Sequence, residues 1–391
     1  MVLGCSLIFF LSLLVFLLWF LQALDLIPGV LFGIPVLRKK SGLPSTNSLP
    51  KISIIFAARN EAAQVREALE SMLAQDYPDF EVIAASDRSA DGTLAEIEKF
   101  RGDSRLKILN VTELPQGWLG KNHALWKGCQ ISSGDWLLFT DADVLFDPKT
   151  LTRAVDAVRE GNLDHLTLFP RLETRGWIEE FFSRGFIFAF LRGCRPWAAQ
   201  NPKSRAFIGI GAFNFLRRDV YEKIGTHQAL ALDVLDDMHL GRAVKHAGFR
   251  QRAMNGAELI RTRWVKGWKG VKESLQKNAF AGLQFRVSEL LLVTAAALVS
   301  DLLPYGLIFV ARGPLLGLSL CAVALIFLSY LAVAKFDLRF LLQFPLHPFA
   351  SLLLLALVWR SAWTALGQGG IRWRDTFYPL EELKKGNPPH A

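Results

Sequence analysis

The chain has 391 residues, of which 51% are hydrophobic and 21% are charged, and its net charge at pH 7 is +9. This composition is too apolar for one ordinary soluble domain, so we expect membrane-spanning segments beside a charged domain. A cytoplasmic surface that faces anionic lipid would explain the positive charge. Because no nucleic-acid motif accompanies that charge, we predict a membrane and no nucleic acid among the partners. The four cysteines form no CxxC pair, which argues against a zinc site or a disulfide framework.

An uncharged N-terminal stretch, residues 2–24, is about as long as a helix that spans a bilayer. A cleaved signal peptide would carry a basic start, a shorter apolar core and a small-residue cleavage site, and none of these is evident. We therefore predict a retained transmembrane anchor. Residues 25–50 are predicted as a linker that ends in the turn-forming residues of Ser41–Pro50. The basic run Arg38-Lys39-Lys40 places the next domain, residues 51–285, in the cytoplasm by the positive-inside rule.

This middle domain is predicted to consist of strands that alternate with helices. Short runs rich in β-branched and aromatic residues predict strands, and longer amphipathic runs predict helices. The predicted strands are Lys51–Ala58, Phe80–Ala85, Leu106–Val111 and Asp135–Thr140, and the predicted helices are Glu61–Leu73, a helix that follows Thr93, and Lys121–Ile131. Asn60 is the expected N-cap of the first helix, and Thr93 has capping-box spacing with Glu96. The alternation predicts an α/β fold, with a mostly parallel sheet and helices on both faces.

Two aspartates separated by one alanine, Asp141 and Asp143, follow the strand Asp135–Thr140. A strand that ends in two carboxylates presents them at its carboxyl edge, where open α/β sheets bind ligands. Oxygen ligands suit Mg²⁺ or Mn²⁺, which proteins commonly hold with one or two carboxylates plus substrate phosphates. The same residues also fit a simpler interpretation, an acidic strand-to-helix turn before a helix that is capped by Asp147.

The C-terminal region, residues 286–366, is apolar again and contains about three candidate spans. They are Leu290–Val310, Gly313–Ala334 and Phe340–Trp359. Asp301 lies inside the first of them, and its carboxylate is expected to face the bundle interior or water. Residues 367–391 form a tail whose basic residues favour the cytoplasmic side, whereas four spans would place that tail outside. The sequence leaves open whether one of the segments is re-entrant or interfacial.

Four short motifs, taken in order, resemble those of family 2 glycosyltransferases. They are Ile54–Glu61, Asp87–Thr93, Asp141-Ala142-Asp143, and Asp236-Asp237 before a predicted helix at Met238–Gly248. In the family the last acidic pair is usually Glu-Asp. The resemblance covers about Lys51–Gln284 and implies the GT-A nucleotide-diphospho-sugar transferase fold. One cytoplasmic GT-A domain between an N-terminal anchor and C-terminal transmembrane helices is similar to the layout of ceramide-glucosyltransferase-like and hopanoid-associated members.

The resemblance implies a donor site. Asp87 would accept the imide N–H of a uracil base, and the backbone at Ala57 and Ala58 would line that base. Glu61 would help to shape the pocket. Asp141 and Asp143 would hold a divalent cation, Mg²⁺ or Mn²⁺, on the diphosphate of the donor, where the ion acts as a Lewis acid.

Lys121 would lie close to the phosphates, because a helix N-terminus is a favourable anion site. An ordinary solvated lysine is an equally simple interpretation. Arg263-Trp264 matches the end of the (Gln/Arg)-x-x-Arg-Trp motif of processive members, but Ile260 stands at its first position. This departure argues against a polysaccharide synthase and leaves open which arginine contacts the diphosphate. Trp264 would stack on the acceptor or anchor the chain at the membrane interface.

Asp237 is the candidate general base. An inverting transfer needs a carboxylate to take the proton of the acceptor hydroxyl as its oxygen attacks the anomeric carbon. Asp236 beside it would raise the pKa of Asp237 by like-charge proximity. Without the resemblance, both would be helix N-terminal residues that favour the helix dipole. Asp233 competes for the role of base.

Two aromatic-rich segments with basic neighbours, Trp177–Leu191 and Trp264–Phe285, suit the membrane interface, with core packing as the alternative. Between them, Gly209-Ile210-Gly211-Ala212 allows close backbone approach to a substrate. These features favour a lipid acceptor. We expect a multi-pass protein of the cell membrane, an inverting glycosyltransferase of hexosyltransferase type, with a UDP-sugar donor and a lipid or isoprenoid acceptor. The alternatives are a processive polysaccharide synthase and a catalytically silent scaffold that binds nucleotide-sugar or lipid.

Overall fold

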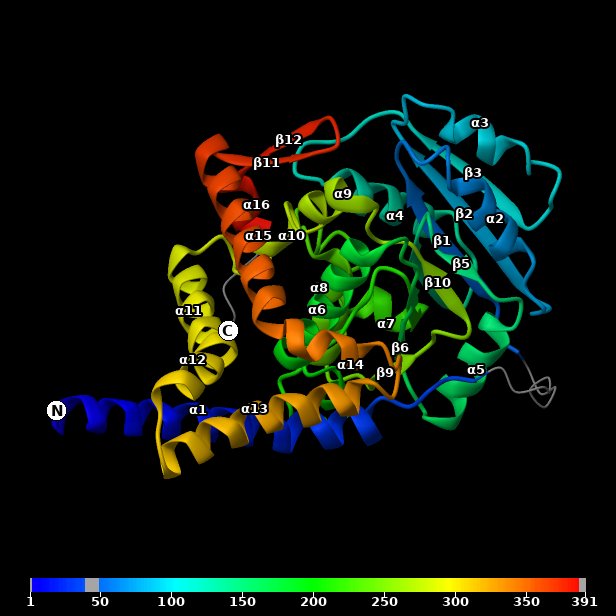
Figure 1. Cartoon of the computed structure of the whole chain (residues 1–391). Helices are drawn as coiled ribbons and strands as arrows, with labels where there is room; N and C mark the ends of the chain where they lie inside the picture. Colours follow the sequence, from blue (N-terminus) through cyan, green and yellow to red (C-terminus); the bar gives the residue numbers. More distant parts are fainter. Residues whose placement is uncertain (1, 39–48, 387–391) are drawn as a thin grey trace. The chain divides into compact units, whose positions relative to one another are not determined.

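The computed structural model describes residues 2–38 and 49–386, in two compact units (Figure 1). The helical unit consists of Met1–Ile34, Thr174–Arg195 and Val265–Leu380, and the α/β unit consists of Pro35–Glu173, Pro196–Trp264 and Glu381–Ala391. Residues 174–195 and 265–285, predicted as part of the middle domain, thus belong to the helical unit. Most of the predicted linker, including Lys39 and Lys40, and residues 387–391 of the predicted tail lie outside the described residues.

The α/β unit is built on a seven-stranded sheet with the order β3-β2-β1-β4-β8-β6-β9. Its strands are β1 (Ile52–Ala58), β2 (Phe80–Asp87), β3 (Leu106–Val111), β4 (Trp136–Asp141), β6 (His165–Phe169), β8 (Asn214–Arg217) and β9 (Gln251–Asn255). Strands β3, β2, β1 and β4 are parallel, as are β6 and β9, whereas β8 runs antiparallel to both of its neighbours. The predicted, mostly parallel sheet is confirmed. A smaller sheet joins β5 (Leu145–Phe146), β10 (Ile260–Thr262) and β7 (Arg171–Leu172).

Helices cover both faces of the large sheet, because successive side chains of a strand point in opposite directions. Ile54 and Phe56 of β1 pack with buried residues of α2 (Val65–Leu73) and α5 (Thr150–Glu160). Ile55, between them, packs on the other face with α4 (Gly120–Gln130), α7 (Arg218–Lys223) and α8 (Asp236–His246). The unit also contains α3 (Thr93–Glu98), η2 (Pro196–Gln200) and most of α16 (Leu380–Gly386).

The two predicted helix caps are wrong, because their side chains join the loops after β1 and β2 to one another. Asn60 has a left-handed backbone (φ 57°), and its Oδ1 accepts the N–H of Ala90 at 2.8 Å, so α2 begins only at Val65. Thr93 is the first residue of α3, and its Oγ1 accepts the N–H of Glu61 at 2.8 Å. Two loops that were predicted separately therefore form one rigid edge of the site.

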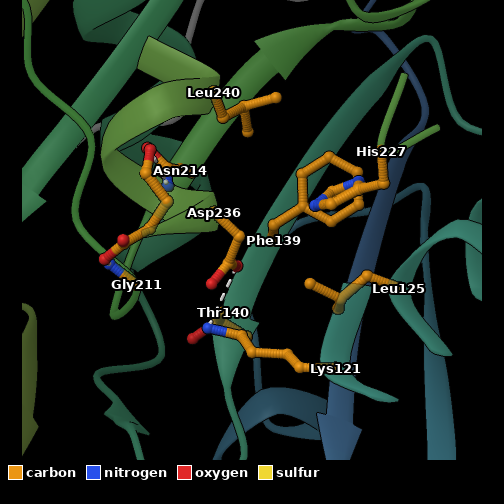
Figure 2. Close-up of a pocket in the computed structure, with 10 residues that line it drawn as sticks. Lys121, Leu125, Phe139, Thr140, Gly211, Asn214, His227, Asp236 and Leu240 are labelled. Atoms are coloured by element: carbon orange, nitrogen blue, oxygen red, sulfur yellow. Dashed lines mark hydrogen bonds and ion pairs between the residues drawn. The ribbon is translucent and has the colours of Figure 1, made fainter. Parts of the chain in front are cut away.

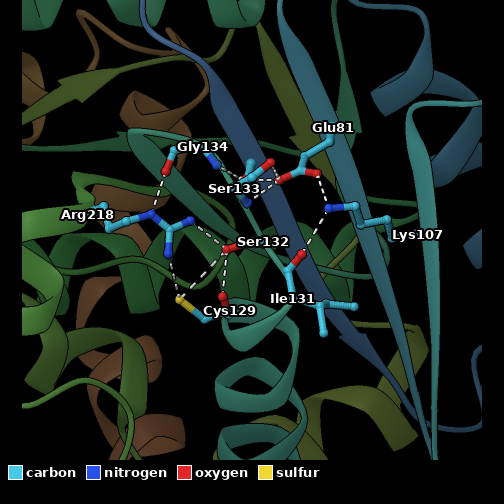
Figure 3. Close-up of polar contacts among 9 residues, drawn as sticks. Glu81, Lys107, Cys129, Ile131, Ser132, Ser133, Gly134 and Arg218 are labelled. Atoms are coloured by element: carbon cyan, nitrogen blue, oxygen red, sulfur yellow. Dashed lines mark hydrogen bonds and ion pairs between the residues drawn. The ribbon is translucent and has the colours of Figure 1, made fainter.

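A buried polar network fixes the opposite ends of the strands (Figure 3). Glu81 of β2 accepts hydrogen bonds from Ser53 (2.7 Å) and from the hydroxyl of Ser133 (3.0 Å), and pairs with Lys107 at 2.7 Å. Burial alone would raise the pKa of Glu81, but these partners lower it to about 2. Arg218 donates to the carbonyl of Gly134 and to Ser132 in the same loop. The network holds the loop between α4 and β4 against β1 and β2.

The helical unit contains four helices long and apolar enough to cross a membrane, among the residues that the structure describes. They are Ser6–Gly33, Val287–Val310, Pro314–Val333 and Phe340–Gln368. The elements are α1 (Val2–Pro28), η1 (Gly29–Gly33), α6 (Trp177–Cys194), α9 (Gly267–Ser274), α10 (Asn278–Gly282), α11 (Val287–Ala297), η3 (Leu298–Leu302), α12 (Leu303–Val310), α13 (Pro314–Val333), α14 (Phe340–Gln343), η4 (Phe344–Leu346), α15 (His347–Gln368), β11 (Gly370–Trp373) and β12 (Thr376–Pro379). Helices α1 and α13 lie side by side (Figure 1). The first helix continues past the predicted end of the anchor, because Asp25 pairs with Arg195 at 2.7 Å instead of ending the helix.

A charged pair lies inside the helical unit. Asp301, in the π-helical turn η3, pairs with Arg192 of α6 at 2.8 Å and accepts a hydrogen bond from Ser351 of α15 at 2.9 Å. Arg192 also lies over the ring of Trp19 of α1, 4.5 Å from its centroid. The pair thus ties three candidate spans to α6. The expectation that the Asp301 carboxylate avoids lipid agrees with its burial.

We predict that Asp301→Asn and Arg192→Met each lower the thermal unfolding midpoint of the full chain in detergent, since removing one partner of a buried pair typically costs about 3–5 kcal/mol. The double variant should lose less than the sum of the two single variants. Arg195→Met is the matched control, because the Arg195–Asp25 pair is exposed and should contribute little. If the double variant loses as much stability as the two single variants together, Asp301 and Arg192 do not stabilise one another.

Candidate active site

Three strands of the large sheet bring polar groups to one edge. The register aligns Ala57 of β1 with Ala85 of β2 and with Asp141 of β4, so the carboxyl ends of these strands lie level. Strand β2 continues to Asp87, and β4 ends at Asp141. The predicted site residues of the first three motifs therefore share the edge at which open α/β sheets bind ligands.

The predicted metal-binding aspartates occupy different environments. Asp141 keeps 42% of its side chain exposed, whereas Asp143 accepts a hydrogen bond from Thr262 Oγ1 at 3.3 Å. Burial, and then the negative charges of Asp141 and Glu61, raise the pKa of Asp143 to about 7. These carboxylates repel one another, and a cation between them would relieve that repulsion.

Asp141 and Asp143 are suited to a divalent cation only if oxygen atoms of a substrate complete its coordination. Among the described residues, no group of three or more His, Cys, Asp and Glu side chains could hold a metal ion. Mg²⁺ usually keeps several waters and is held by one or two carboxylates together with substrate phosphates. Asp141 and Asp143, one exposed and one repelled by its neighbours, are suited to that kind of shared site.

Lys121 connects the edge of the sheet to the start of α8. Its ammonium lies 2.9 Å from Asp141 Oδ1 and 3.2 Å from Asp236 Oδ2, and only 20% of its side chain is exposed. Burial alone would lower the pKa of Lys121, but the charges of Asp141, Asp236 and Asp237 raise it well above its ordinary value. The solvated-lysine interpretation is therefore wrong.

Asp237, the predicted base, is held by two backbone N–H groups. Its Oδ2 accepts from Gly211 at 2.7 Å, and its Oδ1 accepts from Met238 at 2.8 Å. Burial, and then the charge of Asp236, raise the pKa of Asp237 to about 6, against the opposing charge of Lys121. A fixed carboxylate with a pKa near neutrality has the properties of a general base.

Lys121, Asp236 and Asp237 line one small pocket (Figure 2). Lys121 and Asp236 face one another across it. Leu125, Phe139, His227 and Leu240 form an apolar and aromatic part of its wall, and Thr140 and Asn214 add polar groups. Burial lowers the pKa of His227 to about 4, so this ring is neutral at pH 7. Lys121 and Asp236 are largely buried here, and charges interact more strongly at buried positions than in solvent.

The glycines of the loop Ile208–Ala212 allow close approach to α8 and to the carboxylates. A Cβ on Gly209 would lie 1.8 Å from the carbonyl oxygen of Asp237, and one on Gly241 would lie 1.9 Å from that of Ile208. A Cβ on Gly211 would lie 2.7 Å from Asp141 Oδ2 and 3.2 Å from Asp237 Oδ2. These glycines were predicted to admit a substrate, and the structure shows that they admit the protein's own helix and side chains.

Asp87 is already paired. Its two oxygens accept from Arg88 at 2.7 and 3.0 Å, and Arg59 lies 3.9 Å from Oδ2. The pair abuts the N-terminus of α4, since a Cβ on Gly120 would lie 2.3 Å from both Asp87 and Arg88. A nucleobase that contacts Asp87 would therefore contact a carboxylate whose charge is neutralised by arginine.

The remaining candidates are distributed around this centre. Asp233 is buried, accepts the N–H of Leu235 at 3.0 Å and is hydrogen-bonded to Nδ1 of His239, so its carboxylate is engaged elsewhere.

Arg263 and Trp264 follow directly after Thr262, the partner of Asp143. They do not line the pocket of Lys121 and Asp237. The sequence analysis assigned no role to Thr262, Arg88 or His239, although Arg88 lies inside the second motif.

In three comparisons with known proteins, the chain is similar to glycosyltransferases. Residues 53–225 match the family described as Glycosyl transferase family 2. The chain is 23% identical over 234 residues to 4,4'-diaponeurosporenoate glycosyltransferase from Staphylococcus aureus (strain USA300), a match that covers 59% of this chain and 61% of the relative. Among solved structures, mannosyltransferase PcManGT from Pyrobaculum calidifontis, in complex with GDP-Man and Mn²⁺, has a TM-score of 0.54 and 18% identity. That likeness covers 91% of this chain and 99% of the mannosyltransferase and shows a shared fold.

We predict that Gly211→Ala weakens Mn²⁺-dependent nucleoside diphosphate binding with little change in thermal stability, because its Cβ would displace only the ends of two carboxylates. Gly209→Ala should instead lower the unfolding temperature, since its Cβ would meet backbone. Gly102→Ala, where a Cβ meets nothing within 4 Å, is the neutral control. Calorimetry and thermal unfolding of the full chain measure both effects. Normal binding by Gly211→Ala would contradict the assignment of this pocket.

Proposed function

We propose that this chain, which belongs to the family 2 glycosyltransferases, is a membrane-bound inverting enzyme. It moves a sugar from a nucleotide-sugar donor, a UDP-sugar, to a lipid or isoprenoid acceptor. One observation carries the proposal: Lys121 pairs with carboxylates of two separate motifs, Asp141 and Asp236, at the pocket that it lines together with Asp236 and Asp237. A cationic group for a diphosphate and a carboxylate base for an acceptor are the two requirements of the transfer.

The donor would lie along the carboxyl edge of the sheet. Its base would lie at the loops after β1 and β2, against the backbone of Ala57 and Ala58, with Asp87 accepting its imide N–H and Glu61 shaping the pocket. Its diphosphate would lie at Asp141 and Asp143, near Lys121 and Arg263. The solved neighbour with the same fold holds GDP-Man and Mn²⁺, which supports a nucleotide diphosphate site and a cation at this edge.

Asp141 and Asp143 would hold Mg²⁺ or Mn²⁺, which when bound neutralises charge on the departing nucleotide. The protein's own groups do the remaining work. Lys121 stabilises the negative charge that develops on the leaving diphosphate. Asp237, oriented by the N–H groups of Gly211 and Met238, takes the proton of the acceptor hydroxyl onto a carboxylate oxygen. Trp264 would stack on the acceptor.

Asp237 suits the role of base better than its competitors. Asp236 is paired with Lys121, and Asp233 is engaged by His239 and the N–H of Leu235. The pKa of Asp237, about 6, means that its basic form predominates at neutral pH. Asp236 raises that pKa, as the sequence predicted.

A lipid acceptor is supported by the candidate membrane helices and by aromatic side chains outside them. The helical unit carries four candidate spans, and Trp177 and Trp268 are 73% and 48% exposed on α6 and α9. Exposed tryptophans beside basic residues suit the membrane interface. The named acceptor of the Staphylococcus aureus relative, 4,4'-diaponeurosporenoate, agrees with an acceptor of isoprenoid type. We place the catalytic domain on the cytoplasmic face of the cell membrane, as Arg38 and its basic neighbours predict.

The test of the base is Asp237→Asn, which keeps the shape of the side chain but accepts no proton. Turnover should fall by about 10²–10⁴-fold while donor binding persists. In the unmodified enzyme, turnover should fall as the pH drops below about 6, because Asp237 becomes protonated. Asp233→Asn is the matched comparison and should cost less. If Asp233→Asn abolishes turnover and Asp237→Asn does not, the assignment of the base is wrong.

The test of the cation is Asp143→Ala. This variant should lose Mn²⁺-dependent UDP binding, measured by calorimetry, because Asp143 would be one of the two side chains that hold the ion. Addition of EDTA to the unmodified protein should have the same effect. Nucleotide binding that survives both treatments would contradict the cation site.

A further inference from the structure

The position of Lys121 has a consequence for the order in which ligands bind. Its ammonium lies within ion-pair distance of two carboxylates from different elements, Asp141 at the end of β4 and Asp236 at the start of α8. Asp141 is also one of the two side chains proposed to bind the divalent cation. In the described structure, a protein cation therefore already neutralises a carboxylate that the metal would need.

The carboxylates near Lys121 lie so close together that the charge of each one affects the others. A Cβ on Gly211 would lie 2.7 Å from Asp141 Oδ2 and 3.2 Å from Asp237 Oδ2. These two carboxylate oxygens therefore lie close to one another. Asp236 joins them through Lys121. Without the ammonium, these three partly buried carboxylates would lie close together, which is costly unless another cation replaces it.

We propose that Lys121 is an internal counter-ion that competes with the divalent cation for Asp141. Its ammonium leaves Asp141 only when a nucleoside diphosphate binds. The proposal rests on the proposed function, because it needs a diphosphate at this edge. That diphosphate offers the ammonium new oxygen partners, and a lysine can follow them because its charge sits on a flexible four-carbon stem. Asp141 is then released to the metal.

This arrangement couples the two ligands. A metal ion that binds alone must displace the Lys121 ammonium from Asp141. When nucleotide is bound, the ammonium has already moved to the diphosphate, and no displacement is needed. By linkage, the nucleotide raises the affinity for metal by the same factor as metal raises the affinity for the nucleotide. Replacing Lys121 by a neutral side chain should therefore have effects of opposite sign, with tighter binding of metal alone and weaker binding of nucleotide. A lysine that serves only as a phosphate ligand would not tighten metal binding.

The experiment measures Mn²⁺ binding to the full chain in detergent by the electron paramagnetic resonance signal of free Mn²⁺, with and without UDP or GDP. The variants are Lys121→Met, Lys121→Arg and, as control, Lys107→Met, which removes the lysine paired with Glu81 at the other ends of the strands (Figure 3). In Lys121→Met, binding of Mn²⁺ alone should tighten by roughly 5-fold or more, within the range of typical coupling between sites. Nucleotide binding should weaken in the same variant. Lys121→Arg and Lys107→Met should bind Mn²⁺ alone like the unmodified protein.

The outcomes separate this proposal from the proposed function. Unchanged or weaker binding of Mn²⁺ alone to Lys121→Met, together with weaker nucleotide binding, would overturn the counter-ion role and leave the proposed function standing. If Lys121→Met does not fold, the unmodified protein decides, because equal Mn²⁺ affinity with and without nucleotide would overturn the proposal. No binding of either nucleoside diphosphate to the unmodified protein would contradict the proposed function itself.

Discussion

The ion pairs of Lys121 with Asp141 and Asp236 are the interaction on which the site depends. Asp141 and Asp236 are far apart in the chain, and each belongs to a group of acidic residues. Placing these carboxylates close together is unfavourable unless a cation accompanies them. The ammonium of Lys121, at 2.9 and 3.2 Å, supplies that charge and fixes the start of α8 against the end of β4. The position of Asp237, and hence of the proposed base, follows from this contact.

Close backbone approach is the second constraint, and glycines provide it. Gly209 and Gly241 allow the loop Ile208–Ala212 to lie directly on α8, where any Cβ would overlap a backbone oxygen. This contact places the N–H of Gly211 at 2.7 Å from Asp237 Oδ2. The carboxylate is therefore oriented before any substrate arrives, which reduces the reorganisation that a general base would otherwise need. Its pKa near neutrality comes from the same burial and from Asp236.

Much of the fold and part of the site could be predicted from the sequence. Periodicity and strand composition predicted the parallel strands around β1, and the motif order predicted which residues meet at their carboxyl ends. What could not be predicted were the tertiary contacts of individual side chains, inside the motifs as well as outside them. Asn60 matches the pattern of a helix cap but binds the neighbouring loop, Arg88 neutralises Asp87, and Thr262 contacts Asp143 from a distant strand. Asp25, which ended the predicted anchor, is accommodated because Arg195 pairs with it.

The reaction proposed for this site is the transfer of a sugar to a lipid in the membrane. The most direct measurement incubates membranes containing the full chain with radiolabelled UDP-sugars and Mn²⁺, then separates the organic extract from the aqueous phase and from insoluble polymer. Membranes that carry the Asp237→Asn variant provide the background. We expect label in the organic extract that depends on Asp237. Label that accumulates only in polymer, or equal label with both proteins, would contradict it.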